Sequence, residues 1–395
     1  MTDDRPRAPI GTLLAAIGAT TVAALPTLLV GGLAILIGRD LGFGEAELGI
    51  AIAASFGSAA LVSVPAGRLA ERIGPRRVTW IGLGCSTVAL LGIGLIVDSW
   101  AALVPFLCLA GVGVTTVQLG ANVLLARAVP AARQGFAFGA KQAAVPLASL
   151  MAGLALPLIG LTLGWHVPFL LGVLLVPVVL WWLPDAAGVP SSNAHNDGDA
   201  PFGALILLAV GVALASAGGN STPPFIVPAV VDRGFSEAQA GLLLAGGSLV
   251  VILVRVASGW FADRLGRGSL LLVIGLIGVG ALGYVGLALA TQPVLIVVFA
   301  AMAFGGGWGW GGLVLLALSR TNPRAPGRAM GIVQIGPMAG AVLGPLVFGF
   351  LAETIGFSAA WATLAVFAVL GMTAIIISRR QLVAQQAARA AIIRS

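Results

Sequence analysis

Long apolar segments alternate with short polar ones along the whole chain. Twelve of these segments reach the length of about 20 residues that a helix needs to cross a bilayer. They run over 11–37, 46–66, 78–97, 101–126, 136–160, 166–183, 202–230, 238–258, 269–290, 294–319, 328–352 and 358–378. All twelve are predicted to be α-helices, because a lipid-exposed backbone must form its hydrogen bonds within its own segment. The pattern predicts an all-α membrane protein with twelve transmembrane helices.

Composition supports a bilayer setting. Hydrophobic residues make up 59% of the chain and charged residues 9%, whereas soluble proteins average about 25% charged residues. The net charge of +7 comes from short basic groups between the spans. It therefore favours an orientation signal and argues against a nucleic-acid partner.

Basic residues gather at one set of helix ends, which predicts the orientation. That set comprises Arg5, Arg7, Arg68, Arg72, Arg76, Arg77, Arg127, Arg133, Arg264, Arg267, Arg320, Arg324, Arg328, Arg379, Arg380, Arg389 and Arg394. The opposite ends carry only Arg39 and Arg233. The positive-inside rule then places both termini in the cytoplasm, in a multi-pass protein of the plasma (inner) membrane.

An internal repeat divides the chain into two halves. The stretch GRLAERIGP at 67–75 matches GWFADRLGR at 259–267 with a shift of 192 residues, and Asp40 and Gly42 meet Asp232 and Gly234 at the same shift. A polar segment at 184–201 is the predicted cytoplasmic linker between a six-helix bundle at 1–183 and another at 202–395. Two pseudo-symmetric bundles of this kind are typical of transporters with a substrate site between the halves.

The repeated stretch resembles the hallmark loop of the major facilitator superfamily, of the form G-x-x-x-D-R-x-G-R-R. Its first copy is Gly67, Glu71, Arg72, Gly74, Arg76 and Arg77, with Glu71 in place of the usual Asp and with Pro75 inserted; its second is Gly259, Asp263, Arg264, Gly266 and Arg267. The resemblance covers the whole chain and implies the superfamily's fold. An acid at a helix end and arginines in the next turn suit a gate between bundles. We therefore expect gating by Gly67, Glu71, Arg72, Arg76, Gly259, Asp263, Arg264 and Arg267, although these charges would also serve simply to anchor helix ends.

Two cations lie inside predicted spans. Arg255 lies one turn before Gly259, about 6 Å from the helix end, and Lys141 lies about 9 Å inside the 136–160 span. The R-x-x-x-G placement resembles the monocarboxylate porters and the oxalate/formate exchangers, which implies that Arg255 binds a substrate carboxylate. The porters place an Asp where this chain has Val251, and the exchangers place their lysine at the equivalent of Val333. Snorkelling of both side chains toward the cytoplasm is the alternative.

Other polar and aromatic residues within spans complete the candidate substrate site. They are Gln118, Asn122, Gln142, Asn220 and Gln334, with Trp308 and Trp310 as a wall of the site. Interhelical hydrogen bonds and lipid-facing packing are the alternative roles. The stretch GGNSTPP at 218–224 predicts a helix break, because Pro223 and Pro224 lack backbone donors. Gly331, Gly336, Gly340 and Gly344 predict close helix packing.

Transport is the function that these features favour. Two histidines and two separate cysteines offer no catalytic or metal-binding set, so an enzyme, a cofactor and a metal are not expected. We expect a monomer that moves a small organic anion by alternating access. An exporter of drug-like apolar compounds and a transport-inactive sensor are the alternatives.

Overall fold

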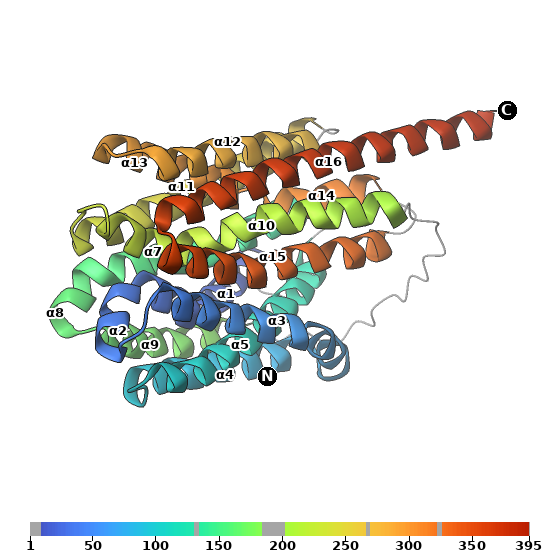
Figure 1. Cartoon of the computed structure of the whole chain (residues 1–395). Helices are drawn as coiled ribbons and strands as arrows, with labels where there is room; N and C mark the ends of the chain where they lie inside the picture. The colour runs from blue at the N-terminus through green and yellow to red at the C-terminus, as the bar shows by residue number, and fades with distance from the viewer. Residues whose placement is uncertain (1–8, 130–133, 184–201, 266–268, 322–325, 395) are drawn as a thin grey trace, which may run out of the picture. The chain divides into compact units, whose positions relative to one another are not determined.

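The computed structural model describes residues 9–129, 134–183, 202–265, 269–321 and 326–394. Within these residues every regular element is a helix (Figure 1). The elements are α1 (Pro9–Gly32), α2 (Ala34–Leu41), α3 (Glu45–Ile73), α4 (Pro75–Leu95), α5 (Trp100–Ala128), α6 (Gln134–Gln142), α7 (Ala144–Ala155), the π-helix η2 (Leu156–Gly160), α8 (Leu161–Leu163), α9 (His166–Trp182), α10 (Phe202–Val231), α11 (Glu237–Leu265), α12 (Ser269–Leu289), α13 (Pro293–Trp308), α14 (Gly311–Thr321), α15 (Pro326–Thr354) and α16 (Phe357–Arg394). Eleven stretches of the described chain are long and apolar enough to cross a membrane, and the shorter His166–Trp182 helix coincides with the sixth predicted segment, 166–183. The predicted all-α fold class is confirmed.

The internal repeat extends to the backbone geometry of the turns. Gly42 and Gly234, which match at the 192-residue shift, have φ angles of 68° and 88°, and Gly164 and Gly356 match at the same shift with φ angles of 88° and 116°. Positive φ favours glycine, since it has no Cβ. The starts of α3 and α11 also correspond: Gly44 N–H donates to Glu47 Oε2, and Ser236 N–H donates to Gln239 Oε1. Both are halves of a capping box.

The chain forms two compact units. Unit 1 comprises Met1–Ser192 with Pro223–Val256, and unit 2 comprises Asn193–Thr222 with Ala257–Ser395. Helices α10 and α11 each contribute residues to both units. The predicted linker at 184–201 lies outside the described residues, so the division into halves at that linker stays a prediction.

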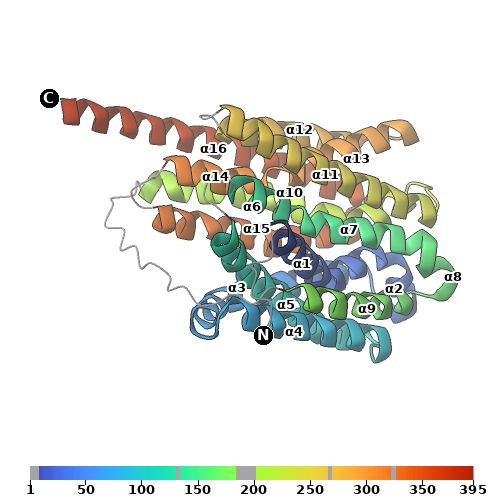
Figure 2. The ribbon, with the colours of Figure 1, turned by 180° about the vertical axis from the view of Figure 1, so that it is seen from behind.

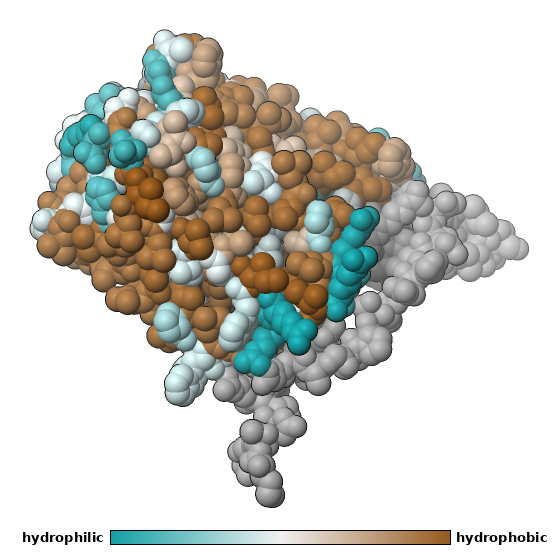
Figure 3. Space-filling model, turned by 90° about the horizontal axis from the view of Figure 1, so that it is seen from below, coloured by the Kyte–Doolittle hydropathy of each residue, from teal (hydrophilic) through white to brown (hydrophobic). Residues whose placement is uncertain are grey.

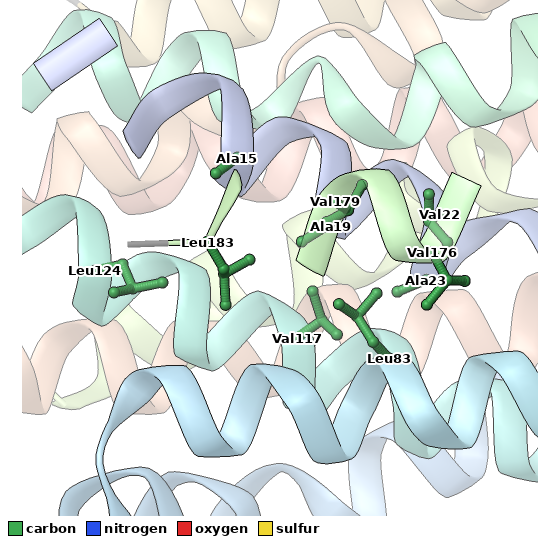
Figure 4. Packing of buried hydrophobic residues seen from close by; sticks show 10 residues of the cluster. All are labelled: Ala15, Ala19, Val22, Ala23, Leu83, Val117, Leu124, Val176, Val179 and Leu183. Carbon is green, nitrogen blue, oxygen red and sulfur yellow. The ribbon is translucent and has the colours of Figure 1, made fainter. Parts of the chain in front are cut away.

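The core of unit 1 forms around α1, which packs against α4, α5, α7 and α9 (Figure 2). Small α1 side chains such as Ala19 and Ala23 meet Leu83 of α4, Val117 of α5 and Val176 of α9 (Figure 4). Small residues allow helix backbones to approach closely, which maximises van der Waals contact in a bilayer where the hydrophobic effect between helices is weak. These four helices of unit 1 are thereby packed together.

Unit 2 uses glycines for the same purpose. An added Cβ at Gly336, Gly340 or Gly344 of α15 would lie 2.2, 2.1 or 2.5 Å from a carbonyl oxygen of α10. The predicted close packing is therefore present at these three positions. Gly331 differs, because an added Cβ there would meet no atom within 4 Å.

The outer surface is mostly apolar. Figure 3 shows hydrophobic residues over most of the visible face, with hydrophilic residues gathered in small groups. Leu61, Trp181 and Leu289 are 83%, 80% and 75% exposed. A soluble protein rarely exposes so much apolar surface, and contact with lipid explains it.

Candidate functional site

The predicted 136–160 span is interrupted beside Lys141. Helix α6 ends at Gln142 and α7 begins at Ala144, with Ala143 N–H donating to Ala140 O at 3.0 Å in a tighter turn. Residue 146, four positions after Gln142, is a proline and has no N–H to donate to the Gln142 carbonyl. The Gln142 carbonyl oxygen therefore lacks its usual helical partner.

Arg255 of α11 supplies a donor to this carbonyl. Its Nη1 donates a hydrogen bond to Gln142 O. Both residues belong to unit 1. A helix C-terminus carries a partial negative charge, which favours a nearby cation. The end of α6 thus provides Arg255 with electrostatic compensation from a backbone carbonyl.

Lys141, in the last turn of α6, lies deeper. Its side chain is 1% exposed, which differs from a snorkelling lysine that extends its ammonium into water. Within the described part of the chain, no hydrogen bond or ion pair is found at its ammonium group. Burial of an ammonium group without an anionic partner costs several kcal/mol, so an anion that reached Lys141 would be stabilised.

Helices α7 and α11 also contact each other at two further levels. The hydroxyls of Ser149 and Ser248 lie 2.8 Å apart. An added Cβ at Gly241 would lie 2.7 Å from Gly153 O, a carbonyl whose helical partner is lost at Pro157. These contacts fix the position of α11 against α7, and with it the position of Arg255.

An ion pair that the sequence did not indicate lies near the start of α11. Arg39, from the last turn of α2, pairs with Glu237 in the first turn of α11. The two residues are 198 positions apart in separate helices, so no spacing rule connects them. The Arg39 side chain is 63% exposed, and an exposed pair of this kind contributes little stability.

The remaining polar candidates of unit 1 lie on α5. Gln118 and Asn122 are both half-buried. Helix α5 contacts α6 as well as α1. The structure thus places these two side chains on a helix that packs beside Lys141's own helix.

The other candidates belong to unit 2. Trp308 ends α13, and Trp310, in the turn that follows, donates from Nε1 to Gly307 O at 2.8 Å. Both indoles are buried. Asn220 donates to Ser216 O and Ser216 Oγ at 2.9 Å. Gln334 is exposed on α15.

The predicted helix break at 218–224 is wrong. Helix α10 runs without interruption from Phe202 to Val231. Ser221 Oγ and Thr222 Oγ1 donate to the carbonyls four residues earlier, Ala217 O and Gly218 O, both at 2.8 Å. Prolines are tolerated in transmembrane helices where side chains and neighbouring helices satisfy the backbone.

A buried aromatic cluster in unit 2 was also not predicted from the sequence. Tyr284, the one tyrosine of the chain, stacks on Trp361 with ring centroids 6.1 Å apart. Its hydroxyl lies 3.4 Å from Thr222 Oγ1. An added Cβ at Gly307 would lie 2.0 Å from this hydroxyl. Tyr284 therefore fills the space beside Gly307, one residue before Trp308.

The predicted gating residues lie at the ends of α3, α4 and α11. Gly67, Glu71 and Arg72 are in the last turns of α3. Arg76 is the second residue of α4, and its guanidinium lies 5.5 Å from the Trp80 ring centroid. Of the second copy, Gly259 is half-buried on α11. The side chains of Asp263 and Arg264, and Arg267 altogether, lie outside the described residues. The gating role stays a prediction.

A bundle of long apolar helices with buried cations defines a multi-pass membrane protein of the transporter type. The family model of the Major Facilitator Superfamily matches residues 10–209 and again 208–391. The chain belongs to the Major Facilitator Superfamily, whose members are transporters and not enzymes.

Relatives and solved structures agree with this assignment. The chain is 26% identical over 317 residues to an uncharacterized MFS-type transporter of Mycobacterium tuberculosis, covering 76% of this chain and 70% of that one. It is 30% identical over 129 residues to a multidrug resistance protein B homolog of the same organism, covering 32% of this chain and only 24% of that protein.

Two solved structures share the fold. A D-xylose–proton symporter matches with a TM-score of 0.74 at 17% identity, covering 93% of this chain and 97% of that one. A bacterial homolog of the human lysosomal transporter Spinster matches with a TM-score of 0.70 at 18% identity, covering 93% and 96%. At these identities the likeness establishes the fold alone.

Proposed function

We propose that this transporter moves a small organic anion, with a carboxylate as the charged group, and that Lys141 and Arg255 of unit 1 bind it. The observation that carries the proposal is the burial of Lys141, which is 1% exposed with no acidic partner among the described residues. An anionic substrate would compensate this charge. The cytoplasmic placement of both termini and function as a monomer belong to the same proposal.

The two cations offer complementary chemistry. A guanidinium is a planar fork that matches a carboxylate through two parallel hydrogen bonds, whereas an ammonium is a compact charge with three donors. Arg255 would then set the orientation of the carboxylate, and Lys141 would strengthen its binding. The roles of Gln118, Asn122, Asn220, Trp308, Trp310 and Gln334 stay predictions from the sequence.

The test is substrate binding by purified protein, followed by uptake into proteoliposomes. The probes are labelled acetate, lactate, benzoate and oxalate, compared with cationic dyes. Arg255→Lys keeps the charge and loses the fork, so we expect carboxylate affinity to fall about tenfold to a hundredfold, the equivalent of a charge-assisted hydrogen bond of about 1.5–3 kcal/mol. Lys141→Gln should weaken binding to a similar degree, and Lys141→Arg should also weaken it because the larger group does not fit the buried position.

Arg233→Lys is the matched control, because Arg233 lies between α10 and α11 and outside both spans. Its carboxylate affinity should equal that of the wild type. Affinity close to wild type in all three Lys141 and Arg255 variants would show that neither residue binds the anion and would refute the proposal.

An exporter of drug-like compounds is the second candidate. It is favoured by the similarity to the multidrug resistance protein B homolog over 129 residues. Binding of cationic dyes, together with no binding of any carboxylate of the panel, would favour the exporter.

A further inference from the structure

We infer that Thr20 of α1 is a further substrate-binding residue, whose hydroxyl donates a hydrogen bond to the carboxylate that Lys141 binds. This inference rests on the proposed function and adds a residue that the sequence analysis did not single out. The observation that carries it is a fully buried hydroxyl without a hydrogen-bond partner in the described chain. This hydroxyl belongs to a helix that contacts α6, the helix of Lys141.

The first step concerns the Thr20 hydroxyl. The residue is 1% exposed, and its Oγ1 has no hydrogen-bond partner among the described residues. Other buried threonines of unit 1 do have partners. Thr79 Oγ1 donates to Pro75 O, four residues earlier in α4, at 2.9 Å, and Thr21 Oγ1 donates to Ala144 O of α7 at 3.1 Å. A buried polar atom without a partner costs free energy, so the exception at Thr20 is one that a bound ligand would explain.

The second step concerns the position of Thr20 relative to Lys141. Ala16 of α1 and Ala137 of α6 belong to one buried cluster. Residues four positions apart lie on the same face of a helix, one turn along. Thr20 therefore lies one turn beyond Ala16, and Lys141 lies one turn beyond Ala137. The hydrogen bond from Thr21 to α7 is further along both segments, which shows that they run in the same direction. Thr20 and Lys141 thus lie at about the same level of unit 1, on adjacent helices.

The third step concerns the chemistry of the two groups. The Lys141 ammonium has three N–H donors and no acceptor, and the Thr20 hydroxyl has one donor. The two groups form no hydrogen bond with each other. An ionised carboxylate accepts hydrogen bonds through both of its oxygens, so a carboxylate between the two groups would accept from each. Both groups are buried in this structure, so the carboxylate reaches them in another conformation of the transport cycle.

The experiment measures binding of labelled acetate, lactate, benzoate and oxalate to the purified full-length protein, and continues with the carboxylate that the wild type binds most tightly. Thr20→Val removes the hydroxyl and keeps the shape of the side chain. The affinity should fall about tenfold or more, as expected for the loss of a hydrogen bond to a charged group. Thr20→Ser keeps the hydroxyl and should retain most of the affinity.

A second measurement separates binding from a structural role. Valine buries no unpaired polar atom, so the thermal unfolding midpoint of Thr20→Val without ligand should equal or exceed that of the wild type. A structural hydroxyl would give the opposite result, a lower midpoint with unchanged affinity, and that result would overturn the inference. Thr79→Val is the matched control, because Thr79 is also fully buried and its hydroxyl bond lies within its own helix. Its carboxylate affinity should equal that of the wild type.

Coupling to Lys141 tests whether the two residues bind one anion. In the Lys141→Gln background, Thr20→Val should weaken binding less than it does in the wild type, because residues that share a partner are not additive. An equal loss in both backgrounds would overturn the shared site.

The remaining outcomes separate the inference from the proposed function. A loss in Lys141→Gln without any loss in Thr20→Val would overturn the role of Thr20 and leave the anion site standing. Equal losses in Thr20→Ser and Thr20→Val would also overturn that role, because the hydroxyl would not be their cause. A wild type that binds none of the four carboxylates overturns the proposed function and this inference together.

Discussion

Replacing Gly340 by alanine should push α15 away from α10 and lower the stability of the protein. An ideal Cβ at Gly340 would lie 2.1 Å from Ala213 O and 2.9 Å from both Ala217 N and Ser216 Cβ. Ordinary contacts of a Cβ begin at 3.4 Å, so the helices must separate by about 1 Å (3.4 − 2.1 = 1.3 Å). Most of the atoms in the way belong to backbone, which cannot move aside as a flexible side chain does.

The loss should exceed that of the methyl group alone. Gly336 and Gly344 lie one turn to either side, and their positions are equally close to α10. A separation at Gly340 therefore weakens van der Waals contact over three turns. Overpacking of this kind costs about 1–3 kcal/mol or more in free energy of unfolding.

Gly331→Ala is the matched control, since it makes the same change on the same helix. An added Cβ there meets nothing within 4 Å. Alanine in a helix interior is favoured over glycine by about 0.5–1 kcal/mol, so this variant should be as stable as the wild type or more stable. The assay is the thermal unfolding midpoint of detergent-purified protein, compared between the variants. A Gly340→Ala midpoint equal to or above that of Gly331→Ala would refute the packing analysis.

Two further predictions concern orientation and coupling. Single cysteines at Ser192 and Ser395, with Cys85 and Cys108 replaced, should resist an impermeant thiol reagent in intact cells; labelling of both from outside would reverse the predicted orientation. No carboxylate lies near the middle of a predicted span and Val251 stands where the monocarboxylate porters have an Asp, so an imposed pH gradient at zero membrane potential should not drive accumulation of the anion. Strong accumulation under that gradient would show that another group carries the proton.

Hydropathy was sufficient to predict the spans, because each apolar segment satisfies its backbone hydrogen bonds locally. The interruptions inside spans depend on finer chemistry. The turn after Gln142 was not predicted, although Pro146 could have indicated it, since the missing N–H lies four residues beyond that carbonyl. The same reasoning was wrong for Pro223 and Pro224, because α10 continues from Phe202 to Val231 although these prolines have no N–H for the carbonyls of Gly219 and Asn220.

The glycines of α15 show how far sequence periodicity can predict helix packing. Gly336, Gly340 and Gly344 repeat every fourth residue and share one helix face, and all three contact α10. Gly331 is five residues from Gly336, which rotates it away from that face. Spacing could have excluded Gly331, whereas the identity of α10 as the partner required the tertiary structure.

For the anion site, the sequence predicted the two cations but not their different surroundings. Two like charges inside the spans with no nearby acid implied that a shared anion is needed to compensate both. In the structure Arg255 already has a carbonyl oxygen at the C-terminal end of α6, so its presence inside the span is accounted for without a substrate. Lys141 has no such partner among the described residues and is more deeply buried. Lys141 is therefore the cation whose burial an anionic substrate would compensate. For this reason Lys141→Gln tests anion binding more directly than Arg255→Lys, which tests the geometry of carboxylate recognition.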